Sequence, residues 1–122
     1  MIRGEIYIAR LKGSGSIQKG VRPVVVIQND TGNNHSPTTI VACVTRQVKK
    51  ETQPTHVLLE YHESVDGMIL CEQLYTLNKK DLRKCVGHLN DSELTSLDRA
   101  LCVSLDINKS SRKGDKLCQK SK

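Results

Sequence analysis

Residues 20–28 read Gly-Val-Arg-Pro-Val-Val-Val-Ile-Gln, and residues 38–45 read Thr-Thr-Ile-Val-Ala-Cys-Val-Thr. Both runs are apolar and rich in β-branched side chains, and the near-continuous apolar run 21–28 is typical of a strand buried on both faces. The segment between them, 29–37, is polar and carries Gly and Pro, which predicts a turn-rich linker. Antiparallel strands joined in this way bring the start of the first beside the end of the second. Arg22 and Thr45 are therefore expected at one end of a sheet, where a cation and a hydroxyl could hold a phosphate.

Further strands are expected on both sides of this pair. Apolar residues alternate in 3–11, and three more runs of β character follow later in the chain. The expected strands are 3–11, 21–28, 38–45, 55–61, 67–77 and 85–89. The loop Lys12–Gly20 is basic and rich in Gly and Ser, so it could close over a ligand. A solvated hairpin connection is the simpler explanation for the loop alone.

Two helices are expected in the C-terminal half. Asn78 is a candidate N-cap for a short helix over 79–84. Asn90 or Asp91 can cap a longer helix that runs to about Asp106, in which leucines recur at spacings of three and four. Helices that follow a set of antiparallel strands are typical of an α+β domain. With loops this short, the five or six strands are expected to curl into a small barrel.

The length of 122 residues indicates one small domain, 1–106, followed by a basic tail, 107–122, that is expected to be disordered. No apolar run approaches the ~18 residues of a membrane span. The N-terminus lacks a signal-peptide pattern, so a cytoplasmic protein is expected. Five cysteines are widely spaced, and the four within apolar patterns are expected to be buried thiols. Cys118 lies in the polar tail and is expected to be exposed.

The net charge of +6 is distributed unevenly along the chain. Residues 1–50 hold eight basic and two acidic side chains, whereas 51–106 hold five basic and ten acidic ones. The tail holds six basic side chains and one acidic one, so it accounts for most of the high isoelectric point. The basic half could contact a polyanion, and the acidic half could be a solvated face.

Several reaction classes are disfavoured by the absence of their motifs. The chain has no phosphate-binding loop, dinucleotide fingerprint, zinc-protease motif or nucleophile elbow. The histidines are isolated, and Cys85-x-x-His88 is a two-ligand fragment without a second pair. Glu72 has no second carboxylate at its strand end, which disfavours a two-metal nuclease. We therefore expect no metal and no cofactor.

RNA cleavage remains possible, because the 2′-hydroxyl beside each phosphodiester is an internal nucleophile. The protein must only orient that oxygen, neutralise charge on the phosphorane and assist proton transfer. Arg22 could donate two hydrogen bonds to phosphate oxygens, and Thr45 could orient an oxygen. The alternatives are an ion pair of Arg22 with an acid such as Glu72, and ordinary strand propensity at Thr45.

The chain resembles the MazF/PemK family of toxin endoribonucleases. The resemblance keeps its order over residues 2–106, and the matching segments are 3–7, 20–30, 32–33, 36–38, the strand ending at 45, 54–57 and 72–74. It implies an SH3-like barrel with appended helices, a symmetric homodimer, a cognate antitoxin and metal-independent cleavage of single-stranded RNA at a specific sequence. It places the catalytic pair on Arg22 and Thr45.

The same resemblance places the loop Lys12–Gly20 beside the RNA groove. The candidate RNA-binding residues are Lys12, Lys19, Gln28, Asn29, Ser36, Gln73 and Tyr75. Two positions depart from the family pattern, since Tyr75 stands where an arginine is frequent and Gly67 where a serine is frequent. An alternative is a non-catalytic toxin of the same fold that inhibits a protein such as a topoisomerase. A non-catalytic nucleic-acid-binding barrel is less favoured, because three tyrosines are the only aromatic residues.

Overall fold

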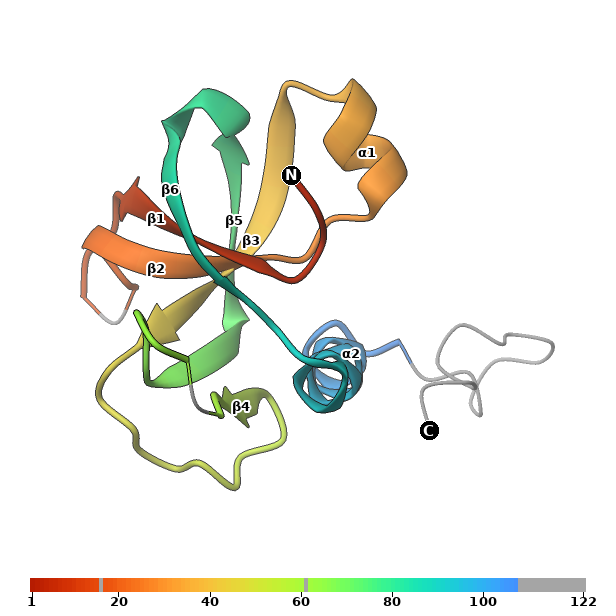
Figure 1. Ribbon diagram of the computed structural model, residues 1–122. Coiled ribbons are helices and arrows are strands. Elements are labelled where there is room, and N and C mark those ends of the chain that lie inside the picture. Colours follow the sequence, from red (N-terminus) through yellow and green to blue (C-terminus); the bar gives the residue numbers. More distant parts are fainter. Residues whose placement is uncertain (16, 61, 108–122) are drawn as a thin grey trace, which may run out of the picture.

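The computed structural model describes residues 1–15, 17–60 and 62–107 (Figure 1). Its strands are β1 (Glu5–Leu11), β2 (Gly20–Val26), β3 (Thr38–Thr45), β4 (His56–Leu58), β5 (Met68–Asn78) and β6 (Leu82–His88). Its helices are α1 (Asp30–His35), the single 3₁₀ turn η1 (Lys79–Asp81) and α2 (Asp91–Ser104). The expectations for Cys118 and for the tail beyond residue 107 lie outside the described residues.

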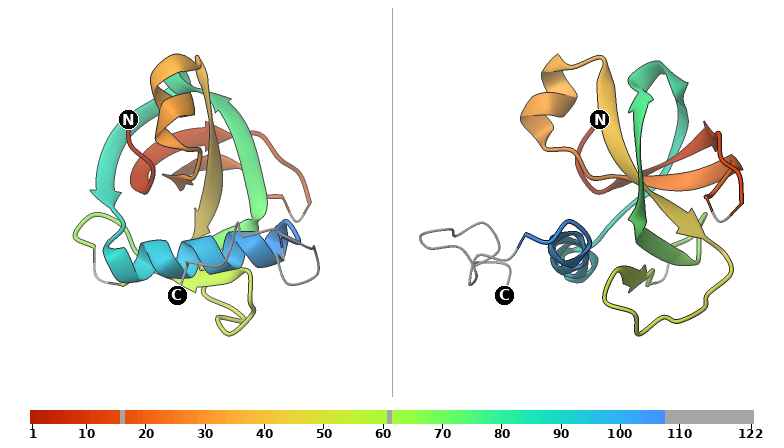
Figure 2. Two further views of the ribbon diagram at one scale, coloured as in Figure 1. Left: turned by 90° about the vertical axis from the view of Figure 1, so that its right-hand side faces the viewer. Right: turned by 180° about the vertical axis from the view of Figure 1, so that it is seen from behind.

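The six strands form one antiparallel sheet in the order β4-β5-β3-β2-β1-β6. Register shifts within the β1–β6 and β3–β5 pairs interrupt the ladders, and such irregularities bend a sheet. Figure 2 shows the resulting curl, with α2 lying across one end of the sheet. This arrangement confirms the predicted α+β fold with a C-terminal helix.

Apolar side chains fill the structure on both faces of the central strands. One cluster lies between the sheet and α2, and it includes Val25 of β2, Ala42 of β3 and Leu97 of α2. The other cluster fills the opposite face, where Val24 of β2 packs with Cys43 of β3. All five residues are 0% exposed. The prediction that the first of these strands is buried on both faces is confirmed for Val24–Val26, whereas Val21 near its start is 50% exposed. The buried middle of the sheet gives the ends of the two strands a rigid frame.

The segment between β2 and β3 was predicted as a linker, but it contains helix α1. The Asn29 side chain caps this helix by accepting a hydrogen bond of 2.7 Å from the Gly32 backbone N–H. Asn33 is 2% exposed and is bonded to the Gln28 carbonyl and the Thr39 hydroxyl. The residues of this helix have weak helix propensity and show no helical periodicity, so the sequence did not predict it. The tertiary contacts stabilise the helix instead.

The prediction of a short helix over 79–84 is wrong after its first turn. Asn78 makes no side-chain capping bond, and the helical turn ends at Asp81. Leu82 and Lys84 instead pair with β1, so β6 begins three residues before the predicted start at 85. Pairing with a neighbouring strand therefore overrides the local helical signal here.

Strand β4 covers only three residues of the predicted strand 55–61, in which Tyr61 is not described. The expectation of buried cysteines is confirmed for Cys43 and Cys71. It is wrong for Cys85, which is exposed on β6, and Cys102 is only half-buried on α2. The edge position of β6 in the sheet explains why its side chains remain accessible.

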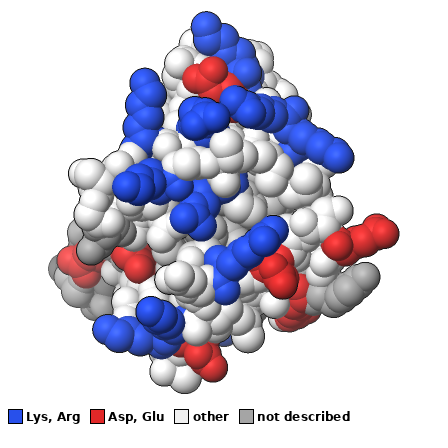
Figure 3. Space-filling model, turned by 90° about the vertical axis from the view of Figure 1, so that its left-hand side faces the viewer, with Lys and Arg blue, Asp and Glu red and all other residues white. Residues whose placement is uncertain are grey.

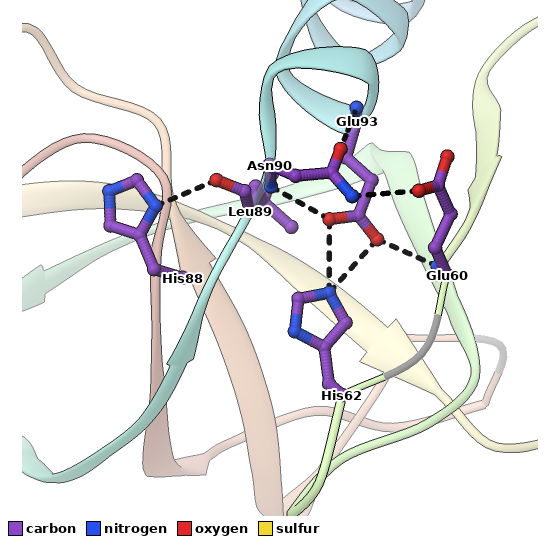
Figure 4. Close-up of polar contacts among 6 residues, drawn as sticks. All are labelled: Glu60, His62, His88, Leu89, Asn90 and Glu93. Atoms are coloured by element: carbon purple, nitrogen blue, oxygen red, sulfur yellow. Dashed lines mark hydrogen bonds and ion pairs between the residues drawn. The ribbon is translucent and has the colours of Figure 1, made fainter.

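The start of α2 is joined to the loop after β4 by a buried carboxylate (Figure 4). Asn90 caps the helix, and Glu93 completes a reciprocal capping box with it. Glu93 also accepts hydrogen bonds from the backbone N–H of Glu60 at 2.7 Å and from His62 Nε2 at 2.9 Å. Burial raises the pKa of Glu93, but these hydrogen bonds and that from Asn90 outweigh it, so the pKa lies below its ordinary value.

Candidate functional site

The pairing of β2 with β3 places the two predicted catalytic residues at the same end of the sheet. Val24 lies opposite Cys43 in this antiparallel pair. The ladder between the two strands ends at this pair, and Arg22 and Thr45 each lie two residues beyond it, at the same end of the sheet. Burial raises the pKa of the Cys43 thiol to about 12, and the nearby Arg22 cation partly opposes that shift. The guanidinium of Arg22 therefore lies close enough to this end of β3 to lower the pKa of a thiol there.

The guanidinium of Arg22 is held by the backbone and by no acid. Its Nε donates a hydrogen bond of 3.0 Å to the carbonyl oxygen of Lys19. Among the described residues no ion pair includes Arg22, so the alternative pairing with Glu72 is not found. The two terminal nitrogens thus have no protein partner in the described part of the chain, and they can donate to an anion.

Thr45 is 6% exposed at the end of β3. Its hydroxyl oxygen accepts a hydrogen bond of 3.1 Å from the Gln47 backbone N–H, which leaves its own proton available to donate. Gly67 packs directly against this end of the strand with φ of +129°. A Cβ at Gly67 would overlap the Thr45 carbonyl oxygen, so glycine is required for this close approach.

The loop between β1 and β2 is bound to β5 beside Arg22. The Tyr75 hydroxyl donates a hydrogen bond of 2.5 Å to the Gln18 carbonyl oxygen. The Gln18 backbone N–H donates one of 2.7 Å to Gln73 Oε1. Burial raises the pKa of Tyr75, which keeps its phenol protonated and able to donate. Three predicted site residues, Lys19, Gln73 and Tyr75, are thereby brought near Arg22.

Lys12 is exposed near the end of β1, in the same loop. The sequence did not predict a role for Gln18, because the contacts that anchor the loop use its backbone N–H and carbonyl groups. No pattern of side chains indicates such contacts. The loop was considered only for its charge and its Gly and Ser content.

The remaining predicted RNA-binding residues lie at the other end of these strands, around α1. Asn29 caps the helix, and Gln28 Nε2 donates to the Thr38 carbonyl at 3.1 Å. The Ser36 hydroxyl accepts from the Thr38 backbone N–H at 3.1 Å. Gln28 lies six residues beyond Arg22 along β2 and its continuation, which is about 20 Å at the usual rise per residue. The structure does not bring Gln28, Asn29 and Ser36 together with the Arg22 end of the sheet.

A polar cluster that the sequence reasoning did not assemble holds the loop after Thr45. His56 Nδ1 faces the Lys50 carbonyl oxygen at 2.9 Å, and its Nε2 faces Glu72 Oε2 at 3.0 Å. Burial raises the pKa of Glu72, but hydrogen bonds from His56 and Thr55 contribute to a net lowering. The segments Pro54–Val57 and Glu72–Leu74 both match the family pattern, but nothing in the sequence shows that they lie in contact.

Basic side chains gather on the face that carries the β1–β2 hairpin and β6 (Figure 3). Strands β1 and β2, their loop, η1 and β6 together hold eight basic residues and two acidic ones. The basic residues are Arg10, Lys12, Lys19, Arg22, Lys79, Lys80, Arg83 and Lys84. Half of them come from the sequence region that is acidic on balance, and the pairing of β6 with β1 brings them to the hairpin. The distribution of charge over the folded surface therefore differs from its distribution along the sequence.

Within the described residues, no group of three or more His, Cys, Asp or Glu side chains is arranged to hold a metal ion. None of the described helices has the length and apolar character needed to cross a membrane.

Comparisons with known proteins give one consistent result. A family model described as PemK-like, MazF-like toxin of type II toxin-antitoxin system matches residues 2–105. A mycobacterial endoribonuclease in complex with its cognate antitoxin is similar in structure, with a TM-score of 0.74 and 21% identity over 88% of this chain and 97% of that one. MazF from Deinococcus radiodurans gives a TM-score of 0.76 and 21% identity over 87% and 96% of the two chains. Mycobacterium tuberculosis toxin MazF-mt6 gives 0.72 and 23% over 85% and 98%. At these identities the structures show a shared fold.

Proposed function

The chain belongs to the family of PemK-like, MazF-like toxins of type II toxin–antitoxin systems, and we propose that it is an endoribonuclease. It cuts single-stranded RNA at a short specific sequence and needs no metal ion. The observation that carries this proposal is the antiparallel pairing of β2 with β3, which brings Arg22 and Thr45 to the same end of the sheet. A guanidinium whose terminal nitrogens have no partner among the described residues suits a phosphodiester, because the planar fork matches two phosphate oxygens. A hydroxyl at the same end of the sheet can donate one further bond.

In the proposed reaction the 2′-oxygen attacks the adjacent phosphorus, and the bond from phosphorus to the 5′-oxygen breaks. The products are a 2′,3′-cyclic phosphate and a 5′-hydroxyl, so the 2′-oxygen loses a proton and the leaving oxygen gains one. Arg22 stabilises the charge on the non-bridging oxygens, where a positioned cation acts most strongly. Arginine gives up its proton only above about pH 12, so a base role in the ground state is disfavoured. The Thr45 hydroxyl donates a hydrogen bond to one of the phosphate or ribose oxygens.

The surroundings of the pair support a polyanionic substrate. The exposed cations of the hairpin and β6 would attract an RNA backbone (Figure 3). The same face would attract the acidic, initially disordered segment of a cognate antitoxin. We extend the proposal to a symmetric homodimer with two equivalent sites, acting in the cytoplasm where messenger RNA is found. Residues 1–106 form its folded domain in this proposal.

The test is cleavage of a long single-stranded RNA by the purified protein in excess EDTA, followed by sequencing of the cut ends. Cuts at one recurring word that carry cyclic phosphates are expected. Arg22→Ala should slow cleavage about 10²–10³-fold, the usual cost of removing a charge-stabilising donor. Thr45→Val keeps the side-chain shape and should also slow it. Arg99→Ala is the matched control, because Arg99 is exposed on α2 and lies outside both the pair and the basic face.

Three outcomes would contradict the proposal. Cleavage that disappears with EDTA would point to a metal-dependent enzyme. Equal activity of Arg22→Ala and Arg99→Ala would remove Arg22 from the chemistry. A folded protein that cuts no RNA would favour the alternative of a non-catalytic toxin with a protein target such as a topoisomerase.

A further inference from the structure

A chain of hydrogen bonds runs from β5 through the β1–β2 loop to the Arg22 side chain. Tyr75 holds the Gln18 carbonyl, and Gln73 holds the Gln18 backbone N–H, at 2.5 and 2.7 Å. The next residue, Lys19, presents the carbonyl that accepts from Arg22 Nε at 3.0 Å. Both peptide groups of Gln18 are therefore held from β5, and the following carbonyl orients the guanidinium.

We propose that Tyr75 and Gln73 are positioning residues that latch the β1–β2 loop onto β5 and thereby orient the Arg22 guanidinium for RNA cleavage. This inference rests on the proposed function. The two side chains act through the loop backbone, so their main effect is on the geometry of Arg22. A guanidinium can donate two parallel bonds to a phosphate only in one orientation of its plane, which makes that orientation valuable.

The geometry of the loop explains why the latch is needed. Gly20 has φ of +87°, and this turn lets the chain pass from Lys19 into β2 with the Lys19 carbonyl facing back toward Arg22. A loop with Gly at 13 and 15 loses much conformational entropy when it is ordered. Contacts from outside the loop must offset that loss, and the bonds from β5 to Gln18 do so.

The latch is also able to open. The side-chain oxygen of Gln18, Oε1, is buried without a hydrogen-bond partner within the described structure. An unpaired buried acceptor opposes closure, since opening would return it to water. Two hydrogen bonds to Gln18 thus stabilise the closed loop, and the buried, unpaired Oε1 of the same residue destabilises it. Removing the Tyr75 hydroxyl should therefore shift the equilibrium toward the open loop.

The experiment compares Tyr75→Phe with Tyr7→Phe, in the full-length protein. Each variant removes one tyrosine hydroxyl and keeps the ring, and the Tyr7 hydroxyl bonds only to Glu5 at 3.0 Å among the described residues. The first measurement is hydrogen exchange of the Gln18 amide and its neighbours in the free protein. The second is the steady-state rate of RNA cleavage, separated into kcat and KM.

Tyr75→Phe should speed exchange of the Gln18 amide and lower kcat about three- to tenfold with little change in KM, as expected for loss of one hydrogen bond. Tyr7→Phe should change neither. Gln73→Leu added to Tyr75→Phe should give less than the sum of the single effects on exchange, because both bonds hold one residue.

Unchanged Gln18 exchange in Tyr75→Phe would overturn the latch, whatever the activity. Faster exchange with a normal kcat, or a change confined to KM, would overturn the positioning of Arg22. A wild-type protein that cleaves no RNA would contradict the proposed function, while the exchange measurement would still decide whether the latch exists.

Discussion

Replacing Glu93 by glutamine is expected to destabilise the folded protein at neutral pH. The Glu93 carboxylate is 1% exposed. Its Oε1 accepts from the Asn90 backbone N–H at 2.9 Å, and its Oε2 accepts from that of Glu60 at 2.7 Å. His62 Nε2 lies within 3.0 Å of both oxygens. Glutamine offers one oxygen and one NH₂, so in either orientation a backbone N–H would face another donor.

The size of the effect follows from these contacts. A buried N–H left without an acceptor costs about 1–3 kcal/mol, and bonds to a charged group are stronger than those to a neutral one by about 1 kcal/mol. Removing one partner of a buried ion pair costs about 3–5 kcal/mol, which is an upper limit here because glutamine retains one acceptor. We expect Glu93→Gln to lower the free energy of unfolding by about 2–4 kcal/mol at pH 7.

The same carboxylate predicts the pH dependence of this loss. Burial raises the pKa of Glu93, but the hydrogen bonds it accepts outweigh burial and bring the folded-state pKa below the ordinary 4.5. Between these two values the unfolded state binds more protons than the folded state, so stability rises with pH in that window. The contribution is fully present above the unfolded-state pKa and is lost as pH falls through the folded-state pKa. The stability gap between wild type and Glu93→Gln should therefore narrow below pH 4.5.

Urea unfolding followed by circular dichroism measures this gap at pH 7, 5 and about 3.5, at one protein concentration because association would shift stability. Glu63→Gln is the control, since Glu63 is exposed on the same loop and should change stability by less than about 0.5 kcal/mol. The reasoning fails if Glu93→Gln equals wild type at pH 7. It also fails if the gap remains constant down to the lowest pH.

Gly67→Ala is expected to lower the free energy of unfolding by at least about 2 kcal/mol, because the backbone at φ +129° places a Cβ on the Thr45 carbonyl. Thermal unfolding measures this, and an unchanged Tm would show that the two segments separate without cost. In the native protein, iodoacetamide should label Cys85 much faster than Cys43 or Cys71. Cys85 is exposed, whereas burial raises the pKa of the other two thiols to about 12. Mass-spectrometric mapping measures the rates, and equal labelling of the three would contradict the described packing.

The sequence predicts best those elements whose signal is local and repeated. The bounds of β3 were predicted to the residue, because an eight-residue apolar run ends in a clear change of composition at Thr45. Asn90 was predicted as a candidate helix cap from its residue type, and the capping box with Glu93 confirms it. Antiparallel pairing alone predicted that Arg22 and Thr45 lie at the same end of the sheet, and the observed pairing of β2 with β3 puts them there.

The features that were missed depend on contacts between distant segments. Helix α1 is built from residues with weak helix propensity, and the contacts of Asn33 with Gln28 and Thr39 stabilise it. The anchoring of the loop uses the backbone of Gln18, and backbone groups are identical in every residue except proline. No reading of side-chain types could have selected Gln18 for this role.

The candidate site combines a rigid frame with an adjustable side chain. Arg22 and Thr45 lie next to Val24 and Cys43, which are both 0% exposed in the middle of the sheet, so their backbones cannot move far. The direction of the guanidinium instead depends on Lys19, in an exposed loop held by a few hydrogen bonds. An RNA that contacts the loop would therefore alter the orientation of Arg22 without moving β2. For the ribonuclease proposed above, this arrangement would couple contact between RNA and the loop to the rate of cleavage, because a displaced loop would no longer orient the cation.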